Sequence, residues 1–272
     1  MTPLARELDG FLATSPDIAL VEVIEAKGST PRGVATWMLV SRDAIFGTIG
    51  GGQLEFMAIA RAREMIGQGV EVSKLDVPLG PEIGQCCGGR VTLYLAMLDE
   101  ELRAAIPERI ICEEELQPHV YLFGGGHVGH ALAKALSLLP LTVTLVETRP
   151  EELADFPEEV RTIATAVPEE VVRDARPGSA FVVLTHDHAL DFLIVAEALA
   201  RDDAVYIGMI GSKTKKATFR SWYLREAGGS EEGFGRLMCP IGGTEVRDKR
   251  PAVIAALVAA ELLRYLPPAP VT

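Results

Sequence analysis

The chain has 272 residues, and its 26 Lys and Arg against 38 Asp and Glu give a formal net charge of −12. This acidic balance excludes the usual nucleic-acid-binding protein, which needs a surplus of basic side chains to neutralise phosphates. A hydrophobic fraction of 48% with 24% charged residues excludes a disordered chain.

The length is enough for two domains of ordinary size. No run approaches the roughly 18 consecutive apolar residues of a membrane span. The segment from Met1 to Glu7 lacks the basic region and apolar core of a signal peptide, so we expect a cytoplasmic protein without nucleic-acid or membrane partners. Four cysteines are too few for a disulfide framework, and we expect them to be thiols.

Short β-rich runs separated by glycine, proline and serine fill the first part of the chain. They predict strands at residues 19–24, 36–40, 44–49 and 91–98, and the apolar spacing over 54–66 predicts one helix. We therefore expect a small mixed α+β domain over residues 1–99. The charged stretch that follows contains Pro107 and Pro118 and predicts a linker over residues 100–117.

The rest of the chain alternates between strand and helix patterns. Strands are predicted at 119–123, 142–147, 160–163, 181–185, 204–209 and 237–238, and helices at 127–139, 189–201, 213–227 and 251–265. Such alternation produces parallel strands joined by helical crossovers. Residues 118–272 are therefore expected to form a Rossmann-like, doubly wound α/β domain with strand order 3-2-1-4-5.

A glycine loop over residues 124–129 joins the first of these strands to its helix. In a Rossmann fold, Gly124 would allow the tight turn, Gly126 a close approach of the backbone to a phosphate, and Gly129 the packing of helix on strand. Glu147 ends the next strand 147 − 129 = 18 residues later, where a ribose-binding carboxylate belongs. Arg149 can instead accommodate a 2′-phosphate, so NAD and NADP both stay open, as does a turn that needs glycine only for packing.

Histidines fall in two loops that this topology brings together at the switch point between strands 1 and 4. His127 lies inside the glycine loop, where the pyrophosphate of a dinucleotide would need room, and this argues against an ordinary redox use of NAD. His186 and His188 flank Asp187 after the fourth strand. The three residues can bind an anionic ligand or serve a metal-dependent hydrolase; alternatively, Asp187 caps the next helix.

The fifth strand leads into Gly211, Ser212 and Lys213 at another helix start, a combination suited to capturing an anion. Lys215 and Lys216 follow, and a solvated helix face explains these two equally well.

Two further glycine-rich turns mark the first domain. Three glycines in succession cost chain entropy, so they suggest that the backbone there approaches a ligand closely, although a flexible turn is the alternative. A second polar turn offers Arg32 to a phosphate. The candidate contacts in these turns are Ser29, Arg32, Gly50, Gly51, Gly52, Gln53 and Glu55.

The neighbouring thiols Cys86 and Cys87 stand in a third glycine-rich segment after Gln85. Exposed thiolates suit sulfur transfer or soft metals, so we expect a functional role for this pair. Cys112 and Cys239 are expected to be structural.

These motifs together resemble the XdhC/CoxI family, the xanthine dehydrogenase accessory proteins. In the first half the resemblance lies in residues 28–32, 47–55 and 84–89, and in the second half in residues 124–129, 185–188, 206–212 and 239–242. Several long motifs in the same order are specific as a set, and they span nearly the whole chain.

The resemblance implies an accessory chaperone without catalytic residues or a metal site of its own. Family members bind the molybdenum cofactor as molybdopterin, shelter it while a cysteine desulfurase replaces an oxo ligand with sulfido, and pass it to apo xanthine dehydrogenase. They are commonly oligomeric, so a homodimer is expected. The alternative is an NAD(P)-dependent oxidoreductase with a nucleotide in the Rossmann crevice. The expected cofactor-binding residues are Ser29, Arg32, Gly50, Gly51, Gly52, Gln53, Glu55, Gln85, Cys86, Cys87, Gly124, Gly126, His127, Gly129, Glu147, His186, Asp187, His188, Gly211, Ser212 and Lys213.

Overall fold

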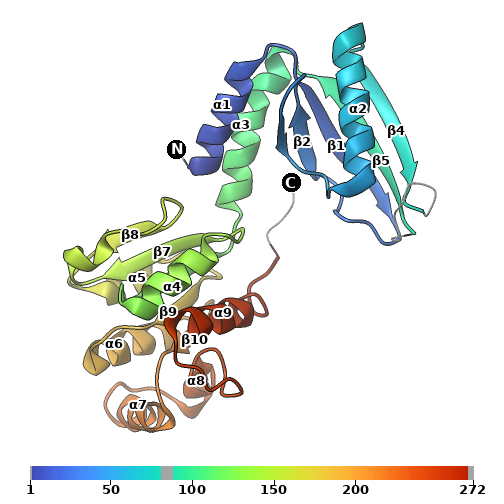
Figure 1. The fold of residues 1–272 in the computed structure, drawn as a ribbon. Helices are drawn as coiled ribbons and strands as arrows, with labels where there is room; N and C mark the ends of the chain where they lie inside the picture. Colours follow the sequence, from blue (N-terminus) through green and yellow to red (C-terminus); the bar gives the residue numbers. More distant parts are fainter. Residues whose placement is uncertain (1, 81–87, 269–272) are drawn as a thin grey trace. The chain divides into compact units, whose positions relative to one another are not determined.

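The computed structural model describes residues 2–80 and 88–268 (Figure 1). The described chain divides into two compact units, one ending at Glu115 and the other beginning at Leu116. No helix within the described residues combines the length and apolar character that crossing a membrane requires.

The first unit is built on a five-stranded antiparallel sheet with strand order β3-β2-β1-β5-β4. Its strands are β1 (Ala19–Lys27), β2 (Trp37–Val40), β3 (Ile45–Gly47), β4 (Val72–Pro78) and β5 (Arg90–Met97). The sequence pattern did not predict β4, because only one of its side chains, Val77, is buried. An edge strand of this kind lacks the alternating apolar signal of a half-buried strand.

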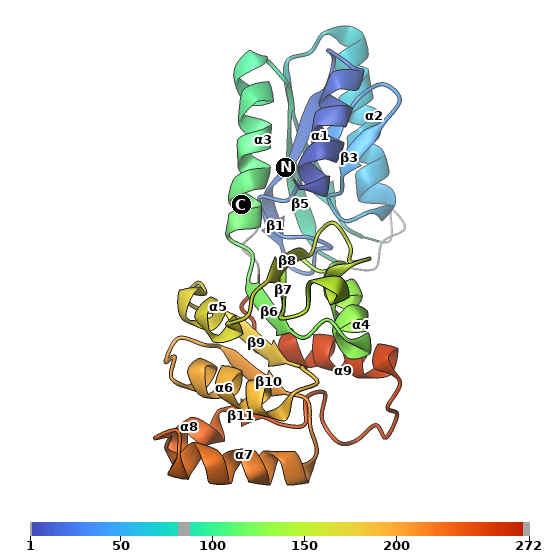
Figure 2. The same cartoon turned by 90° about the vertical axis from the view of Figure 1, so that its left-hand side faces the viewer.

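Helices cover both faces of this sheet (Figures 1 and 2). The helix α2 (Gly52–Gln68) buries Leu54, Ala58 and Met65 with one set of strand side chains. The helices α1 (Pro3–Thr14) and α3 (Glu100–Glu115) pack with the opposite set, which includes Trp37 and Phe46.

The expected linker over residues 100–117 is wrong, because most of it forms α3. Asp99 begins this helix by accepting a hydrogen bond of 2.8 Å from the backbone N–H of Leu102. Ile106 and Ile110, one helical turn apart, are both buried against the sheet. The many charged residues obscured this apolar pair in the sequence pattern. Pro107 lies inside the helix.

The second unit contains a six-stranded parallel sheet with strand order β11-β10-β9-β6-β7-β8. Counted from β6, this is the expected order 3-2-1-4-5 with a sixth strand added, so the Rossmann-like fold is confirmed. The strands are β6 (His119–Phe123), β7 (Thr142–Glu147), β8 (Arg161–Ala164), β9 (Ala180–Val183), β10 (Tyr206–Met209) and β11 (Leu237–Met238).

Helices lie on both faces of the parallel sheet, as in doubly wound folds. One apolar cluster joins α4 (His127–Leu136) and α9 (Pro251–Leu262) to the sheet. A second cluster joins α5 (Pro168–Asp174), α6 (His188–Leu199) and α7 (Lys213–Arg225) to the other face. The short helices α5, α8 (Glu231–Gly235) and η2 (Pro150–Leu153) were not predicted, because one or two turns carry little periodic signal.

Candidate functional site

The glycine loop between β6 and α4 needs glycine for steric reasons. Gly124 has φ +119°, and a Cβ atom there would lie 2.7 Å from the carbonyl oxygen of Leu184 at the end of β9. A Cβ atom on Gly129 would lie 2.0 Å from the carbonyl oxygen of Gly124. The loop therefore packs tightly against its own helix and against the neighbouring strand, at the switch point of the sheet.

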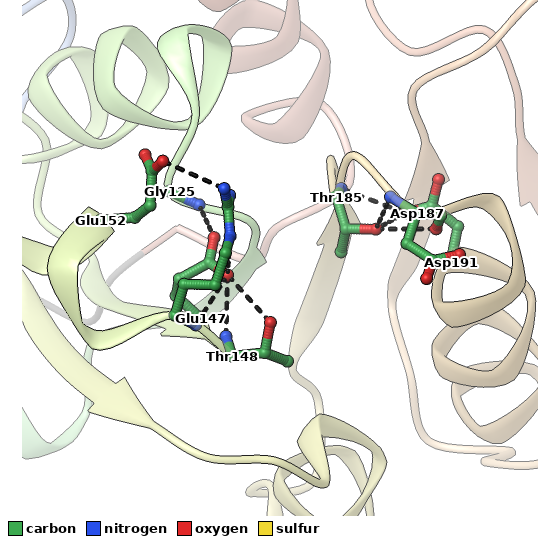
Figure 3. A network of polar contacts seen from close by, with 8 residues as sticks. Gly125, Glu147, Thr148, Glu152, Thr185, Asp187 and Asp191 are labelled. Carbon is green, nitrogen blue, oxygen red and sulfur yellow. Dashed lines mark hydrogen bonds and ion pairs between the residues drawn. The ribbon is translucent and has the colours of Figure 1, made fainter.

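Glu147 at the end of β7 holds this loop in place (Figure 3). Its Oε2 accepts a hydrogen bond of 2.8 Å from the backbone N–H of Gly125. Its Oε1 accepts from the backbone N–H groups of Thr148, at 2.8 Å, and Arg149, at 3.1 Å. Burial raises the pKa of Glu147, but the backbone hydrogen bonds and the Arg149 charge together hold that pKa below its ordinary value.

The geometry gives Glu147 a different role from the expected one. Both of its carboxylate oxygens already accept hydrogen bonds within the chain, so a ribose hydroxyl would compete with three backbone N–H donors. A Cβ atom on Gly125 would also lie 2.7 Å from the carbonyl oxygen of Glu152, because η2 packs on the loop. Glu147 is a brace for the loop, and its contact with a ribose stays a prediction.

The N-terminus of α4 is open to an anion. Gly126 is its N-cap residue and has no side chain to accept from the first-turn N–H groups, and that turn contains no acidic residue. A Cβ atom on Gly126 would meet no atom within 4 Å. Backbone N–H groups without a side-chain cap therefore lie at the positive end of this helix dipole, and exposed His127 is the first helical residue.

The second loop of the switch point is organised by Asp187, which caps α6. Its carboxylate accepts hydrogen bonds from the backbone N–H groups of Ala189, at 2.8 Å, and Leu190, at 3.4 Å. His186 and His188 beside it are exposed. Among residues 2–80 and 88–268, no three His, Cys, Asp or Glu side chains gather in a way that could hold a metal ion.

A buried ion pair lies next to this loop, and the sequence analysis missed it. Asp191 is fully buried, and its carboxylate accepts hydrogen bonds from the backbone N–H of Thr185 at 3.1 Å and from its hydroxyl at 2.7 Å (Figure 3). The Lys215 ammonium pairs with the same carboxylate and donates to the carbonyl oxygen of Ile210 at 3.0 Å. The pair thus ties the loop after β9 to the loop after β10.

A signal for this pair was present in the sequence. Asp191 shares one face of α6 with Ile194, Val195 and Ala198, which are all buried. A carboxylate in an apolar helical stripe needs a buried partner, and the nearby basic cluster contained one in Lys215.

The start of α7 uses its serine for the helix itself. Ser212 is the N-cap residue, and its hydroxyl accepts from the backbone N–H of Lys215 at 3.2 Å. Lys213 is exposed. A Cβ atom on Gly211 would lie 2.9 Å from Cδ of Lys215 and 3.3 Å from Sγ of Cys239, so this glycine makes room for both side chains.

Cys239 is buried, and burial raises the pKa of its thiol although Lys216 and Lys215 oppose that shift. A neutral, buried thiol is consistent with the structural role that we expected for it.

Three turns of the first unit come together at one end of its sheet. A Cβ atom on Gly89 would lie 2.3 Å from the carbonyl oxygen of Ser29, and one on Gly50 would lie 2.6 Å from Cβ of Pro31 and 3.2 Å from Cγ of Arg32. We call residues 28–32, 48–52 and 88–89 the N-terminal loop cluster. The structure therefore brings together the two polar turns that the sequence analysis singled out.

Glu55 braces the triple glycine as Glu147 braces the other loop. Its Oε2 accepts hydrogen bonds of 3.1 Å from the backbone N–H groups of Ile49 and Gly51. Gly51 is the N-cap of α2 and has no side-chain cap, but the Glu55 carboxylate in the first turn already engages backbone N–H groups there, so this helix start is less open to an anion than that of α4. Arg32, in the turn over residues 28–32, and Gln53, in the first turn of α2, are both exposed. The remaining candidates, Gln85, Cys86 and Cys87, lie outside the described residues.

Models of known protein families match part of each unit. A model of the XdhC Rossmann domain matches residues 120–262, and a model of the XdhC and CoxI family matches residues 12–75. Together they cover the parallel sheet and part of the antiparallel one.

Two individual proteins are similar along nearly the whole chain. The uncharacterized protein YqeB of Escherichia coli (strain K12) is 25% identical over 259 residues, which are 93% of this chain and 44% of YqeB. The chain thus spans less than half the length of this relative. A crystal structure of a protein from Bacillus halodurans, described as a xanthine dehydrogenase, superposes with a TM-score of 0.77 at 18% identity, over 97% of this chain and 96% of that one. That likeness shows a shared fold.

Proposed function

Because this chain belongs to the XdhC and CoxI family, we propose that it is an accessory protein in the maturation of xanthine dehydrogenase. In this proposal it binds the molybdenum cofactor as molybdopterin and shelters it while a cysteine desulfurase adds the terminal sulfido ligand. It then delivers the cofactor to apo xanthine dehydrogenase. It works in the cytoplasm, as a homodimer, and catalyses no reaction itself.

The observation that carries the proposal is the bare N-terminus of α4. Molybdopterin ends in a phosphate, and a phosphate is bound well by backbone N–H groups at the positive end of a helix. The first turn of α4 has no side-chain cap, no acidic residue, and free space above Gly126. The donor set of this loop therefore fits a phosphate group.

The first unit offers a further basic group. Arg32 lies in the turn that packs against Gly50, beside a helix start whose backbone N–H groups are already engaged by Glu55. In the proposal, Ser29 and Gln53 are the polar contacts of the first unit, and Lys213, His186 and His188 are those of the second. The proposed set also includes Gln85, Cys86 and Cys87, which lie outside the described residues.

A nucleotide in the Rossmann crevice is the second candidate, and the strand order favours it because dinucleotides bind at this switch point. The bracing role of Glu147 counts against it, since the usual ribose acceptor is engaged by the chain. Calorimetric titration with NAD and with NADP decides between the two functions. Absence of binding at millimolar concentration removes the oxidoreductase.

The maturation role is tested on protein purified from a host that produces molybdopterin. We expect the protein to carry pterin, measured by the fluorescence of its oxidised form, and to accelerate the activation of apo xanthine dehydrogenase. Protein that carries no pterin and leaves the activation rate unchanged would refute the proposal.

A further inference from the structure

The first unit contains a pocket of about 370 Å³ that belongs to none of the loops described above. It lies between α1, α3 and the edge of the sheet formed by β2 and β3. Apolar side chains form much of its lining, and two carboxylates join them. The lining residues used here are Leu4, Glu7, Trp37, Phe46, Ile110 and Glu113.

Aromatic side chains in this pocket are held in fixed positions. The rings of Trp37 and Phe46 are both nearly buried, with centroids 6.0 Å apart. The indole N–H of Trp37 donates a hydrogen bond of 3.0 Å to Oε1 of Glu113. A rigid aromatic surface of this kind is complementary to a flat aromatic ligand, which loses little conformational entropy on binding.

The carboxylates provide acceptors beside the rings. The second oxygen of Glu113 has no hydrogen bond from the described part of the chain, and neither does the carboxylate of Glu7 among those residues. N–H groups on a ligand are the donors that such carboxylate acceptors bind.

A positive charge is already in place at this pocket. The guanidinium carbon of Arg109 lies 5.3 Å from the ring centroid of Trp37, and its Nε lies 3.4 Å from Oε1 of Glu113. Arg109 also pairs with Glu22 at 2.8 Å. The carboxylates of Glu22 and Glu113 offset this guanidinium, so the acceptors in the pocket favour a ligand that brings N–H donors.

We propose that this pocket binds a planar heterocycle through a 2-amino-4-oxopyrimidine edge, with Glu7 and Glu113 accepting from its N–H groups. Pterins and guanine share this edge. The assignment to the pterin ring of the molybdenum cofactor rests on the function proposed above, whereas the recognition of the edge rests on the pocket alone.

The pocket adjoins the N-terminal loop cluster along the chain. Thr36, which also lines it, ends the connection that contains Arg32, and Gly47 begins the turn that leads to the triple glycine. The same two connections therefore reach both the pocket and the N-terminal loop cluster.

Calorimetric titration of the full chain tests the proposal with three probes. Pterin has the full edge, lumazine has an oxo group in place of the 2-amino group, and guanosine 5′-monophosphate presents the same edge on a purine. We expect lumazine to bind at least about tenfold more weakly than pterin, because it lacks a donor to a charged acceptor. Tighter binding of pterin than of the guanine nucleotide identifies the source as a pterin, and the reverse order identifies a nucleotide.

Conservative variants locate the binding. Glu113→Gln and Glu7→Gln should each weaken pterin binding about tenfold, because each loses a charged acceptor but keeps its shape. Glu108→Gln, on an exposed position of the same helix, is the matched control and should bind like wild type. Thermal unfolding midpoints check that all three variants fold.

Failure of this proposal is distinguishable from failure of the proposed function. If purified protein carries molybdopterin, but free pterin and the nucleotide do not bind and Glu113→Gln retains as much cofactor as wild type, the pocket proposal is overturned alone. Equal binding of pterin and lumazine would also overturn it. If pterin binds and depends on Glu113, but no molybdopterin is carried, the pocket stands and the maturation role falls.

Discussion

Glu147 at the end of β7 accepts a hydrogen bond of 2.8 Å from the backbone N–H of Gly125, in the loop that follows β6. The carboxylate that a Rossmann fold usually offers to a ligand here fixes the shape of the glycine loop. The N–H groups of the next residues, at the start of α4, are left for an anion. This division of roles is the basis of the first two predictions.

Replacing Glu147 with Gln should destabilise the second unit. The amide nitrogen cannot accept, so at least one backbone N–H group loses its partner, at a cost of about 1 to 3 kcal/mol. Urea unfolding measures this change in free energy. Glu152→Gln, at a partly exposed position in the same network, is the control and should cost less than about 1 kcal/mol. Equal effects of the two substitutions would contradict the bracing role.

The contribution of Glu147 to stability should depend on pH. Its folded-state pKa lies below the ordinary value of 4.5, so the stabilisation is complete above about pH 4.5 and is lost as the pH falls through the folded-state pKa. The difference in unfolding free energy between wild type and Glu147→Gln should therefore shrink when the pH is lowered from 7 to 3. A difference that grows at low pH would contradict this account.

Two glycines of the same loop should respond differently to alanine. Gly124→Ala forces a side chain onto φ +119° and into the backbone of Leu184, so we expect a loss of about 1 to 3 kcal/mol or more in stability. Gly126→Ala meets open space at φ −67° and should cost at most about 1 kcal/mol. In the proposed function the phosphate binds at this helix start, so this variant should fold but retain less cofactor. Full retention by Gly126→Ala would show that the phosphate binds elsewhere.

The buried pair of Asp191 and Lys215 should be far more sensitive than a surface pair on the same helix. Asp191→Asn leaves the Lys215 ammonium without its counter-charge, at a cost of about 3 to 5 kcal/mol. Glu197→Gln, which removes the exposed pair with Arg173, should cost no more than about 1 kcal/mol. The double variant Asp191→Asn/Lys215→Met should be more stable than the sum of its single changes implies. Additive effects in this cycle, measured by urea unfolding, would refute the coupling.

The sequence predicted the parallel sheet well, because β6 is a mostly apolar run followed by glycine and β7 is rich in Val and Leu. It did not predict α3, where charged residues outnumber Ile106 and Ile110, nor the edge strand β4. Both are stabilised by contacts with distant parts of the chain, which local patterns do not record.

The same limit applies to the candidate site. Glycines were identified reliably, since positive φ values and close backbone approaches leave few other choices at positions such as Gly124. The partners of Glu147 and Ser212 were less predictable: each suits a ligand by its type, and each is used instead to brace a loop or cap a helix. For Asp187, the alternative that it caps the next helix is confirmed. Asp191 was missed although its place in the apolar stripe of α6 signals a buried partner, because that pattern does not say which basic residue pairs with it.

The central claim, that the protein binds the molybdenum cofactor, is tested most directly by the pterin content of protein purified from a molybdopterin-producing host. We predict that wild type carries pterin, that Cys86→Ala/Cys87→Ala carries clearly less without global unfolding, and that the exposed-site control Cys112→Ala carries as much as wild type. Wild-type protein without pterin would contradict the claim, and equal retention by all three proteins would contradict the assignment of the thiols.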